Sequence, residues 1–111
     1  MARIGERPLD LDQIPFFLFF IKSINGWGPV YHSQIWFDNG DNVGFFPNRL
    51  REDAGHTIAN YTFTRYPRYY NDDCMRLAVE NVRSRWNMHY NFLLHNCHDF
   101  TNAAENEYNR L

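Results

Sequence analysis

The residues around Cys97 have the types and order of a reactive thiol. A mostly apolar run over residues 90–94 is followed by Asn96, and a helical pattern begins at Cys97 itself. Unsatisfied backbone N–H groups and the helix macrodipole favour negative charge at a helix N-terminus, so they stabilise a thiolate relative to a thiol. Asn96 suits the N-cap position, and His98 and Asp99 place polar side chains in the first turn. This pattern predicts that Cys97 is a nucleophile.

A nucleophilic thiol needs a base, and His32 is the best-placed imidazole. It lies within residues 29–37, whose β-branched and aromatic residues predict a strand. Alternation along this strand places His32 and Gln34 on one face, which could face the last helix. A cysteine and a histidine on separate elements indicate thiol hydrolase chemistry. We therefore expect iodoacetamide to modify Cys97 faster than Cys74.

Each of these residues also has a structural interpretation. Cys97 could be a small buried apolar residue, since free cysteine is among the most buried residue types. His32 could be a satisfied structural histidine. A metal site at His95, Cys97 and His98 is a further alternative, but side chains this close together at a helix start cannot all converge on one tetrahedral ion. We expect no metal ion and no cofactor.

Length and composition predict one globular domain over residues 1–111. Hydrophobic residues make up 44% of the chain and aromatic residues 18%, which is enough for a dense core. The formal net charge is −2, and the arginines are scattered among acidic residues, so nucleic acid is not expected as a partner. Two cysteines give no disulfide framework, and synthesis in a reducing cytoplasm follows. We expect Cys74 to be a core residue.

The N-terminal part of the chain shows no membrane or secretion signal. The longest apolar run, residues 14–21, is far shorter than the roughly 20 residues that span a bilayer. It predicts a buried strand, so stable membrane insertion is not expected. Residues 1–13 carry charges of both signs without a cleavage pattern, and we interpret them as an N-terminal extension.

Hydrophobic periodicity predicts a sheet followed by helices. Strands are expected over residues 15–24, 29–37, 43–47 and 61–66, with an Asn-Gly turn at Asn39 and a surface loop over residues 48–60. Helices are expected from Asn71 and from Cys97. Their predicted buried stripes are Met75, Val79, Val82 and Trp86 in the first, and Phe100, Ala104 and Tyr108 in the second. The fold class is therefore α+β, a small antiparallel sheet packed against helices.

Three segments together resemble the circularly permuted papain-like thiol hydrolases. The segments are His32–Phe37, Gly44–Pro47 and Tyr90–Phe100. That group includes permuted NlpC/P60 enzymes, lecithin:retinol acyltransferase-like proteins and PPPDE peptidases. In it, a histidine opens an early strand and an Asn-Cys pair opens a later helix, in the order found here. The segments also resemble papain-like toxin domains of bacterial effectors.

The resemblance implies a permuted papain-like fold with Cys97 as nucleophile and His32 as general base. The residue that orients the imidazole matches no fixed motif. Gln34 is one candidate because it shares the strand face of His32. Asn48 is the other, because we expect it near His32 across the hairpin. The predicted catalytic set is thus Cys97, His32, Gln34 and Asn48.

The resemblance also implies an amide substrate. We expect a peptidoglycan peptide, cleaved by an effector that a secretion system such as type VI delivers to the periplasm of a target cell. A cognate immunity protein is then an expected partner. The alternatives are a lipid ester hydrolase or acyltransferase, a protein-cleaving cysteine peptidase, and a non-catalytic interaction domain with the same fold. We expect no hydrophobic C-terminal anchor, which disfavours a membrane lipid.

Overall fold

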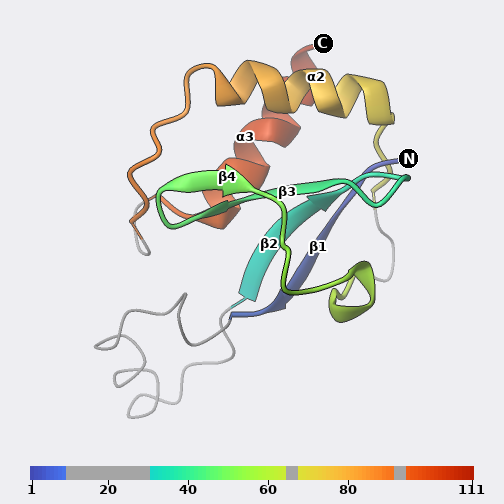
Figure 1. The fold of residues 1–111 in the computed structure, drawn as a ribbon. Coiled ribbons are helices and arrows are strands. Elements are labelled where there is room, and N and C mark those ends of the chain that lie inside the picture. Colours follow the sequence, from blue (N-terminus) through green and yellow to red (C-terminus); the bar gives the residue numbers. More distant parts are fainter. Residues whose placement is uncertain (10–30, 65–67, 92–94) are drawn as a thin grey trace.

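The computed structural model describes residues 1–9, 31–64, 68–91 and 95–111. These residues form an α+β domain in which a four-stranded antiparallel sheet packs with two helices (Figure 1). The elements are β1 (Arg3–Pro8), β2 (Tyr31–Trp36), β3 (Asn42–Phe46), β4 (Arg49–Arg51), the 3₁₀ turn η2 (Ile58–Asn60), α2 (Asp72–Arg83) and α3 (Cys97–Arg110). The predicted class, an antiparallel sheet packed against helices, is confirmed.

The strands follow one another in the order β1-β2-β3-β4. β1 pairs with β2 along its whole length, from Arg3 opposite Trp36 to Pro8 opposite Tyr31. The charges of residues 1–13 predict an extension, whereas the structure places Arg3–Pro8 in the sheet. β1 lacks the alternation of apolar and polar residues that predicts a strand, because one of its buried residues is Arg7. This charged side chain is buried in an ion pair rather than solvated. The strand predicted over residues 15–24 lies outside the described residues.

A tight hairpin joins β3 to β4. Pro47 and Asn48 form its turn, and Asn48 has a φ of 67°. Asparagine tolerates this left-handed conformation better than most residues, and proline suits the preceding turn position. The segment predicted as a loop over residues 48–60 therefore contains β4 and η2. The strand predicted over residues 61–66 is wrong for its described part, in which Thr62 makes only an isolated bridge with Glu6.

Both helices begin where their capping residues predict. The Asn71 side chain caps α2 by accepting a hydrogen bond from the N–H of Cys74. The core side of α2 carries Met75, Val79 and Val82, as its period predicts, whereas Trp86 lies beyond the end of the helix and is only partly buried. Cys74 is exposed, so the expectation that it is a core residue is wrong.

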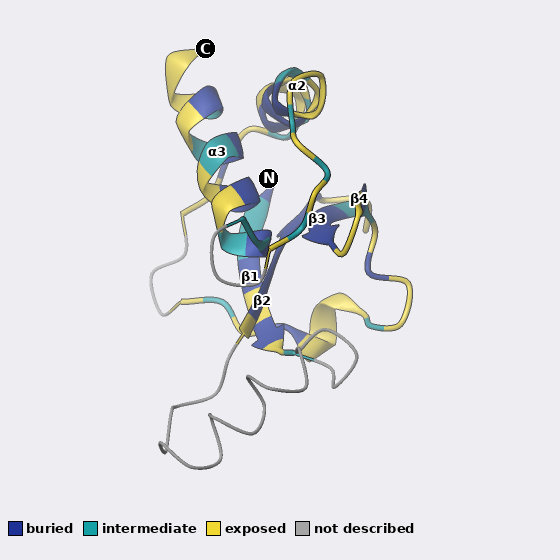
Figure 2. Cartoon of the chain, turned by 90° about the vertical axis from the view of Figure 1, so that its left-hand side faces the viewer, coloured by how far each residue is buried: buried dark blue, intermediate teal, exposed yellow. Residues whose placement is uncertain are grey.

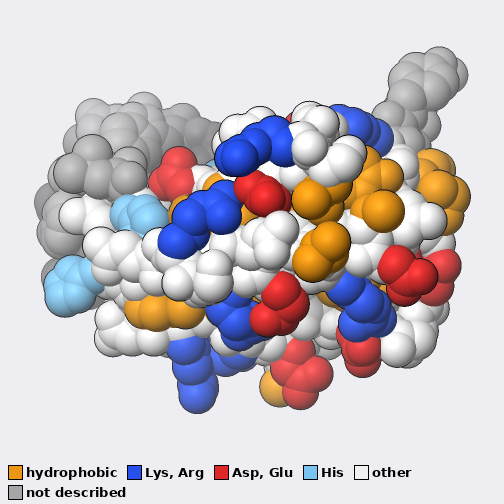
Figure 3. Space-filling view, turned by 90° about the horizontal axis from the view of Figure 1, so that it is seen from above, with side chains coloured by type: hydrophobic (Ala, Val, Ile, Leu, Met, Phe, Trp, Pro, Cys, Tyr) orange, Lys and Arg blue, Asp and Glu red, His pale blue; other side chains and the backbone are white. Residues whose placement is uncertain are grey.

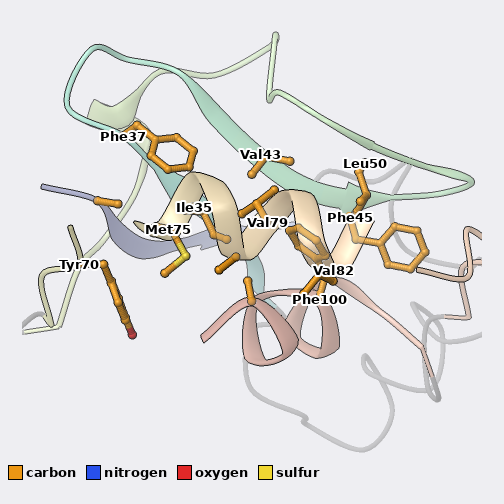
Figure 4. Close-up of a cluster of buried hydrophobic side chains, with 13 residues drawn as sticks. Ile35, Phe37, Val43, Phe45, Leu50, Tyr70, Met75, Val79, Val82 and Phe100 are labelled. Atoms are coloured by element: carbon orange, nitrogen blue, oxygen red, sulfur yellow. The ribbon is translucent and has the colours of Figure 1, made fainter. Parts of the chain in front are cut away.

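The core lies between the helices and one face of the sheet (Figure 4). Ile35 from β2 and Phe45 from β3 meet Phe100 from α3 in this cluster. Figure 2 shows that the buried stripes of α2 and α3 turn toward the interior. Because alternate residues of a strand point to opposite faces, His32 and Gln34 lie on the face of β2 that these helices do not cover. That second face carries the polar groups described below.

The outer surface mixes charges of both signs. On the face shown in Figure 3, arginine side chains lie among aspartate and glutamate side chains, with no large area of one sign. In the described ranges, neither helix combines the length and the apolar composition needed to cross a bilayer.

Candidate functional site

Cys97 is the first residue of α3, and its position is fixed by a capping box. The Asn96 side chain accepts hydrogen bonds from the N–H groups of His98 and Asp99 at 3.0 and 3.3 Å. The Asp99 carboxylate accepts the Asn96 N–H at 2.9 Å in return. These bonds satisfy donors that a helix start otherwise leaves open. The predicted helix start at Cys97 is confirmed.

The Cys97 sulfur lies among several hydrogen-bond donors. The Tyr90 hydroxyl and the backbone N–H groups of Ser33, Cys97 and His98 all favour the thiolate. Burial acts in the opposite direction and is the largest effect, because only 2% of the Cys97 surface is exposed. The pKa of Cys97 is raised as a result. In this conformation the thiol form is favoured, contrary to the expectation of a resting thiolate.

The first turn of α3 occupies an edge of β2 that β3 leaves open. β3 pairs with β2 at Ile35 and Trp36, toward the end of β2. Earlier in β2, the Tyr31 carbonyl accepts a hydrogen bond from His98 Nε2 at 2.8 Å and lies 4.0 Å from the Cys97 sulfur. One part of this edge of β2 is therefore paired with β3, and the earlier part is contacted by α3. This brings Cys97 to the residues on either side of His32.

His32 itself points away from Cys97. Its ring contacts Phe46, with centroids 4.4 Å apart, on the sheet face that the helices do not cover. Ser33 points toward α3 instead, where its hydroxyl lies 3.1 Å from that of Thr101. The prediction that His32 faces the final helix is wrong. Alternation separates the two faces of a strand correctly, but it does not say which face a distant helix will cover.

The His32 imidazole is buried and held by Gln34. The two side chains meet at 2.7 Å, between His32 Nε2 and Gln34 Oε1. His32 has no exposed surface, and burial lowers its pKa to about 4. The ring is therefore neutral at pH 7, a state in which one nitrogen can accept a proton.

The two candidates for orienting the imidazole have different environments. Gln34 contacts His32 directly. Asn48 is exposed in the turn between β3 and β4, and its described contacts do not include His32. Its left-handed backbone gives it a role in the turn. The structure thus brings Gln34, but not Asn48, to the imidazole.

Gly44 makes room for this pair. A Cβ atom built at Gly44 would lie 1.8 Å from Gln34 Oε1 and 3.1 Å from His32 Nε2. The first distance is too short for a side chain at position 44 unless Gln34 moves, and the second is a tight contact. The glycine in the segment Gly44–Pro47 is therefore required by close approach of the Gln34 amide.

A polar network that the sequence pattern does not reveal lies beside His32. Asp53 forms a buried ion pair with Arg7, with 2.7 Å between Asp53 Oδ2 and Arg7 Nε. The Tyr61 hydroxyl donates to the same carboxylate, and His56 Nδ1 lies 3.1 Å from its other oxygen. Hydrogen bonds from Arg7, Tyr61 and His56 outweigh burial and lower the pKa of Asp53 to about 2. No local sequence signal marks these residues, because they meet only in the folded chain.

The remaining histidines near Cys97 have structural partners. His95 stacks on Trp86, with ring centroids 4.5 Å apart, and its Nε2 lies 2.6 Å from the Asn87 carbonyl oxygen. His98 Nε2 is engaged with Tyr31, as described above. Among the residues that the structure describes, no group of three or more histidine, cysteine or acidic side chains is arranged to hold a metal ion.

A polar groove of about 300 Å³ lies between β1 and α3. Ser33 and His98, whose backbone N–H groups act to lower the pKa of Cys97, form part of its wall. Charged groups of both signs, Glu6, Arg68 and Glu105, also line it. Cys97 itself is not part of the wall, but its neighbours Ser33 and His98 are, and the groove could hold an extended polar molecule.

The burial of Cys97 predicts low thiol reactivity in the free protein. At pH 7 we expect iodoacetamide to modify exposed Cys74 faster than Cys97, because the reagent reaches Cys74 and because burial keeps Cys97 protonated. The rate at Cys97 should rise with pH as its thiolate forms. Mass spectrometry of peptides from the alkylated protein measures both rates, with urea-unfolded protein as the control in which they converge. Faster modification of Cys97 in the folded protein would contradict this buried arrangement.

The structure brings some of the predicted site residues together and separates others. His32 and Gln34 form a hydrogen-bonded pair on one face of β2, while Cys97 lies against the edge and the opposite face. His32 and Cys97 are both buried and are not paired with each other. Tyr90 and Ser33 join the cysteine, and Asn42, described below, joins Gln34.

No family model, curated protein or solved structure matches this chain.

Proposed function

We propose that this chain is a cysteine hydrolase in which Cys97 is the nucleophile and His32, oriented by Gln34, is the general base. The observation that carries the proposal is the set of donors around one sulfur atom. The N-terminus of α3, the Ser33 N–H and the Tyr90 hydroxyl all favour negative charge on Cys97. A buried structural cysteine needs none of these groups, whereas a nucleophile that becomes anionic during attack needs them.

The protonation states favour general-base catalysis over a resting ion pair. Burial keeps Cys97 a thiol and His32 a neutral imidazole at pH 7. In the proposed reaction, the imidazole takes the thiol proton as the sulfur attacks an amide carbonyl. The proton then passes to the leaving amine, and water releases the acyl group from the sulfur. Backbone N–H groups at the start of α3 would stabilise the oxyanion.

Catalysis requires the two groups to meet, and the described conformation holds them apart. His32 is separated from Cys97 by the backbone of β2, although the residues on either side of it, Tyr31 and Ser33, both contact the cysteine. A shift of the first turn of α3 around this edge of β2, with His32 still held by Gln34, would bring the sulfur to the imidazole. We propose that substrate binding favours this second arrangement.

The substrate we propose is a peptide amide, most specifically a peptidoglycan stem or cross-link peptide cut by an antibacterial effector. The groove lined by Ser33 and His98 supports a peptide over a lipid, because its charged and hydroxyl-bearing wall suits a polar chain better than an acyl chain. The choice of peptidoglycan among peptides rests on the resemblance to effector domains.

Incubation with purified peptidoglycan tests this assignment. We expect new muropeptide peaks by mass spectrometry, and we expect the Cys97→Ala variant to leave the pattern unchanged. Periplasmic expression should lyse bacteria, whereas cytoplasmic expression should be tolerated. Release of fatty acid from phospholipid vesicles without a change in muropeptides would favour the lipid ester alternative. Toxicity confined to the cytoplasm would favour a protein-cleaving peptidase.

A second candidate function is a non-catalytic interaction domain. The burial and separation of Cys97 and His32 favour it, because a resting hydrolase usually keeps its nucleophile and base within reach of each other. The two candidates differ in one measurement. An electrophilic amide probe that acylates the hydrolase at Cys97 would leave an interaction domain unlabelled.

A further inference from the structure

We propose that Asn42 is a positioning residue, which through Gln34 fixes the His32 imidazole in the tautomer with its proton on Nε2. The lone pair that accepts a proton is then on Nδ1. The catalytic part of this role rests on the proposed function, whereas the tautomer is a property of the folded chain and can be measured alone. Two successive hydrogen bonds, which we call the relay, connect Asn42 at the start of β3 to Gln34 in β2 and Gln34 to His32.

The backbone sets the orientation of the Asn42 amide. Asn42 Oδ1 lies 2.7 Å from the N–H of Asp53, and a backbone N–H can only donate. Asn42 Nδ2 lies 3.1 Å from the carbonyl oxygen of Gly40, which can only accept. Turning the amide over would place two donors together at Asp53 and two acceptors together at Gly40. The oxygen of Asn42 must therefore face Asp53.

The same logic then orients Gln34. Gln34 Nε2 lies 2.8 Å from Asn42 Oδ1 and 3.3 Å from the carbonyl oxygen of Arg51. Both neighbours are acceptors, so this end of the Gln34 amide must be the nitrogen. Its oxygen is left facing His32 Nε2 at 2.7 Å. His32 Nε2 must carry a proton to make that bond, and in the neutral ring Nδ1 then lacks one.

The surroundings keep this arrangement neutral and closely packed. The two charges with the largest influence on the pKa of His32 belong to Arg7 and Asp53. The first lowers this pKa and the second raises it. The Gln34 amide oxygen occupies the space that a Cβ atom at position 44 would take, so it packs closely against Gly44. Removing the Asn42 oxygen would leave the Asp53 N–H and one Gln34 N–H without this acceptor. Only the longer bond to the Arg51 carbonyl, at 3.3 Å, would then hold the Gln34 amide, so part of the population could turn it over and favour the other tautomer of His32.

Nitrogen-15 NMR of the imidazole rings tests the tautomer in the intact chain at pH 7. We expect a pyrrole-type shift at His32 Nε2 and a pyridine-type shift at Nδ1. In Asn42→Ala this single pattern should give way to a mixture. Asn42→Asp loses the donor to the Gly40 carbonyl but keeps an oxygen that accepts from both Gln34 and Asp53, so it should keep the wild-type tautomer. Asn39→Ala, the same change in the same turn, should leave the pattern unaltered.

Activity gives the second measurement. With a hydrolysed peptide substrate, Asn42→Ala should lower kcat about tenfold or more with little change in KM, and Asn42→Asp should restore most of it. A proton on Nδ1 in the wild type, or an unchanged tautomer in a folded Asn42→Ala variant, would overturn the proposal. If Asn42→Ala does not fold, the wild-type and Asn42→Asp spectra decide. An Nε2–H tautomer in a chain that hydrolyses nothing would refute the hydrolase assignment and leave the relay intact.

Discussion

Cys97→Ser is expected to lower the rate of amide hydrolysis by about 10⁴-fold or more, because a hydroxyl is a far weaker nucleophile than a thiol in a site built around sulfur. His32→Ala should lower the rate by about 10²–10⁴-fold, the usual contribution of a general base. The double variant should be no slower than Cys97→Ser alone, since groups that act as one unit are not additive. Single-turnover kinetics on a fluorogenic peptide measures all three rates.

The controls for this prediction separate chemistry from folding. Cys97→Ser changes little volume, so its free energy of unfolding should stay close to that of the wild type. Cys74→Ser replaces an exposed thiol and should leave the rate unchanged. A Cys97→Ser variant with nearly full activity, or additive losses in the double variant, would contradict the assignment of a Cys97–His32 pair.

Asp53→Ala is expected to lower the free energy of unfolding by ~3–5 kcal/mol, the cost typical of removing one partner from a buried ion pair. Arg7 is only 2% exposed, so its guanidinium would lose this carboxylate without regaining full hydration. Tyr61 and His56 would lose the same partner. Urea unfolding followed by circular dichroism at pH 7 measures the change.

An exposed ion pair provides the matched comparison. Glu80→Ala removes the carboxylate that meets Arg83 on the surface of α2, where the glutamate side chain is 66% exposed. It should cost less than ~0.5 kcal/mol, because water and salt screen such pairs. If Asp53→Ala were as mild as Glu80→Ala, the Arg7–Asp53 pair could not be a major contributor to the stability of the domain.

The elements found from the sequence are those whose signals are local. Asn71 and Asn96 mark the helix starts because a capping side chain bonds to backbone groups two or three residues away. The buried stripe of α2 follows from the helical period. Two strands, β2 and β3, were predictable from their β-branched and aromatic residues. β1 was not predicted, because its buried residues include the charged Arg7 rather than only apolar side chains.

The sequence by itself determined the α+β class, the start of α3 at Cys97 and the shared strand face of His32 and Gln34, because each depends on residues close together in the chain. Only the tertiary structure decided that α3 covers the opposite face of β2, that Cys97 is buried among donors from β2 and Tyr90, and that Asp53 meets Arg7 across 46 positions. Periodicity defines two faces of a strand but leaves open what packs on each, since that depends on how distant apolar surfaces bury one another.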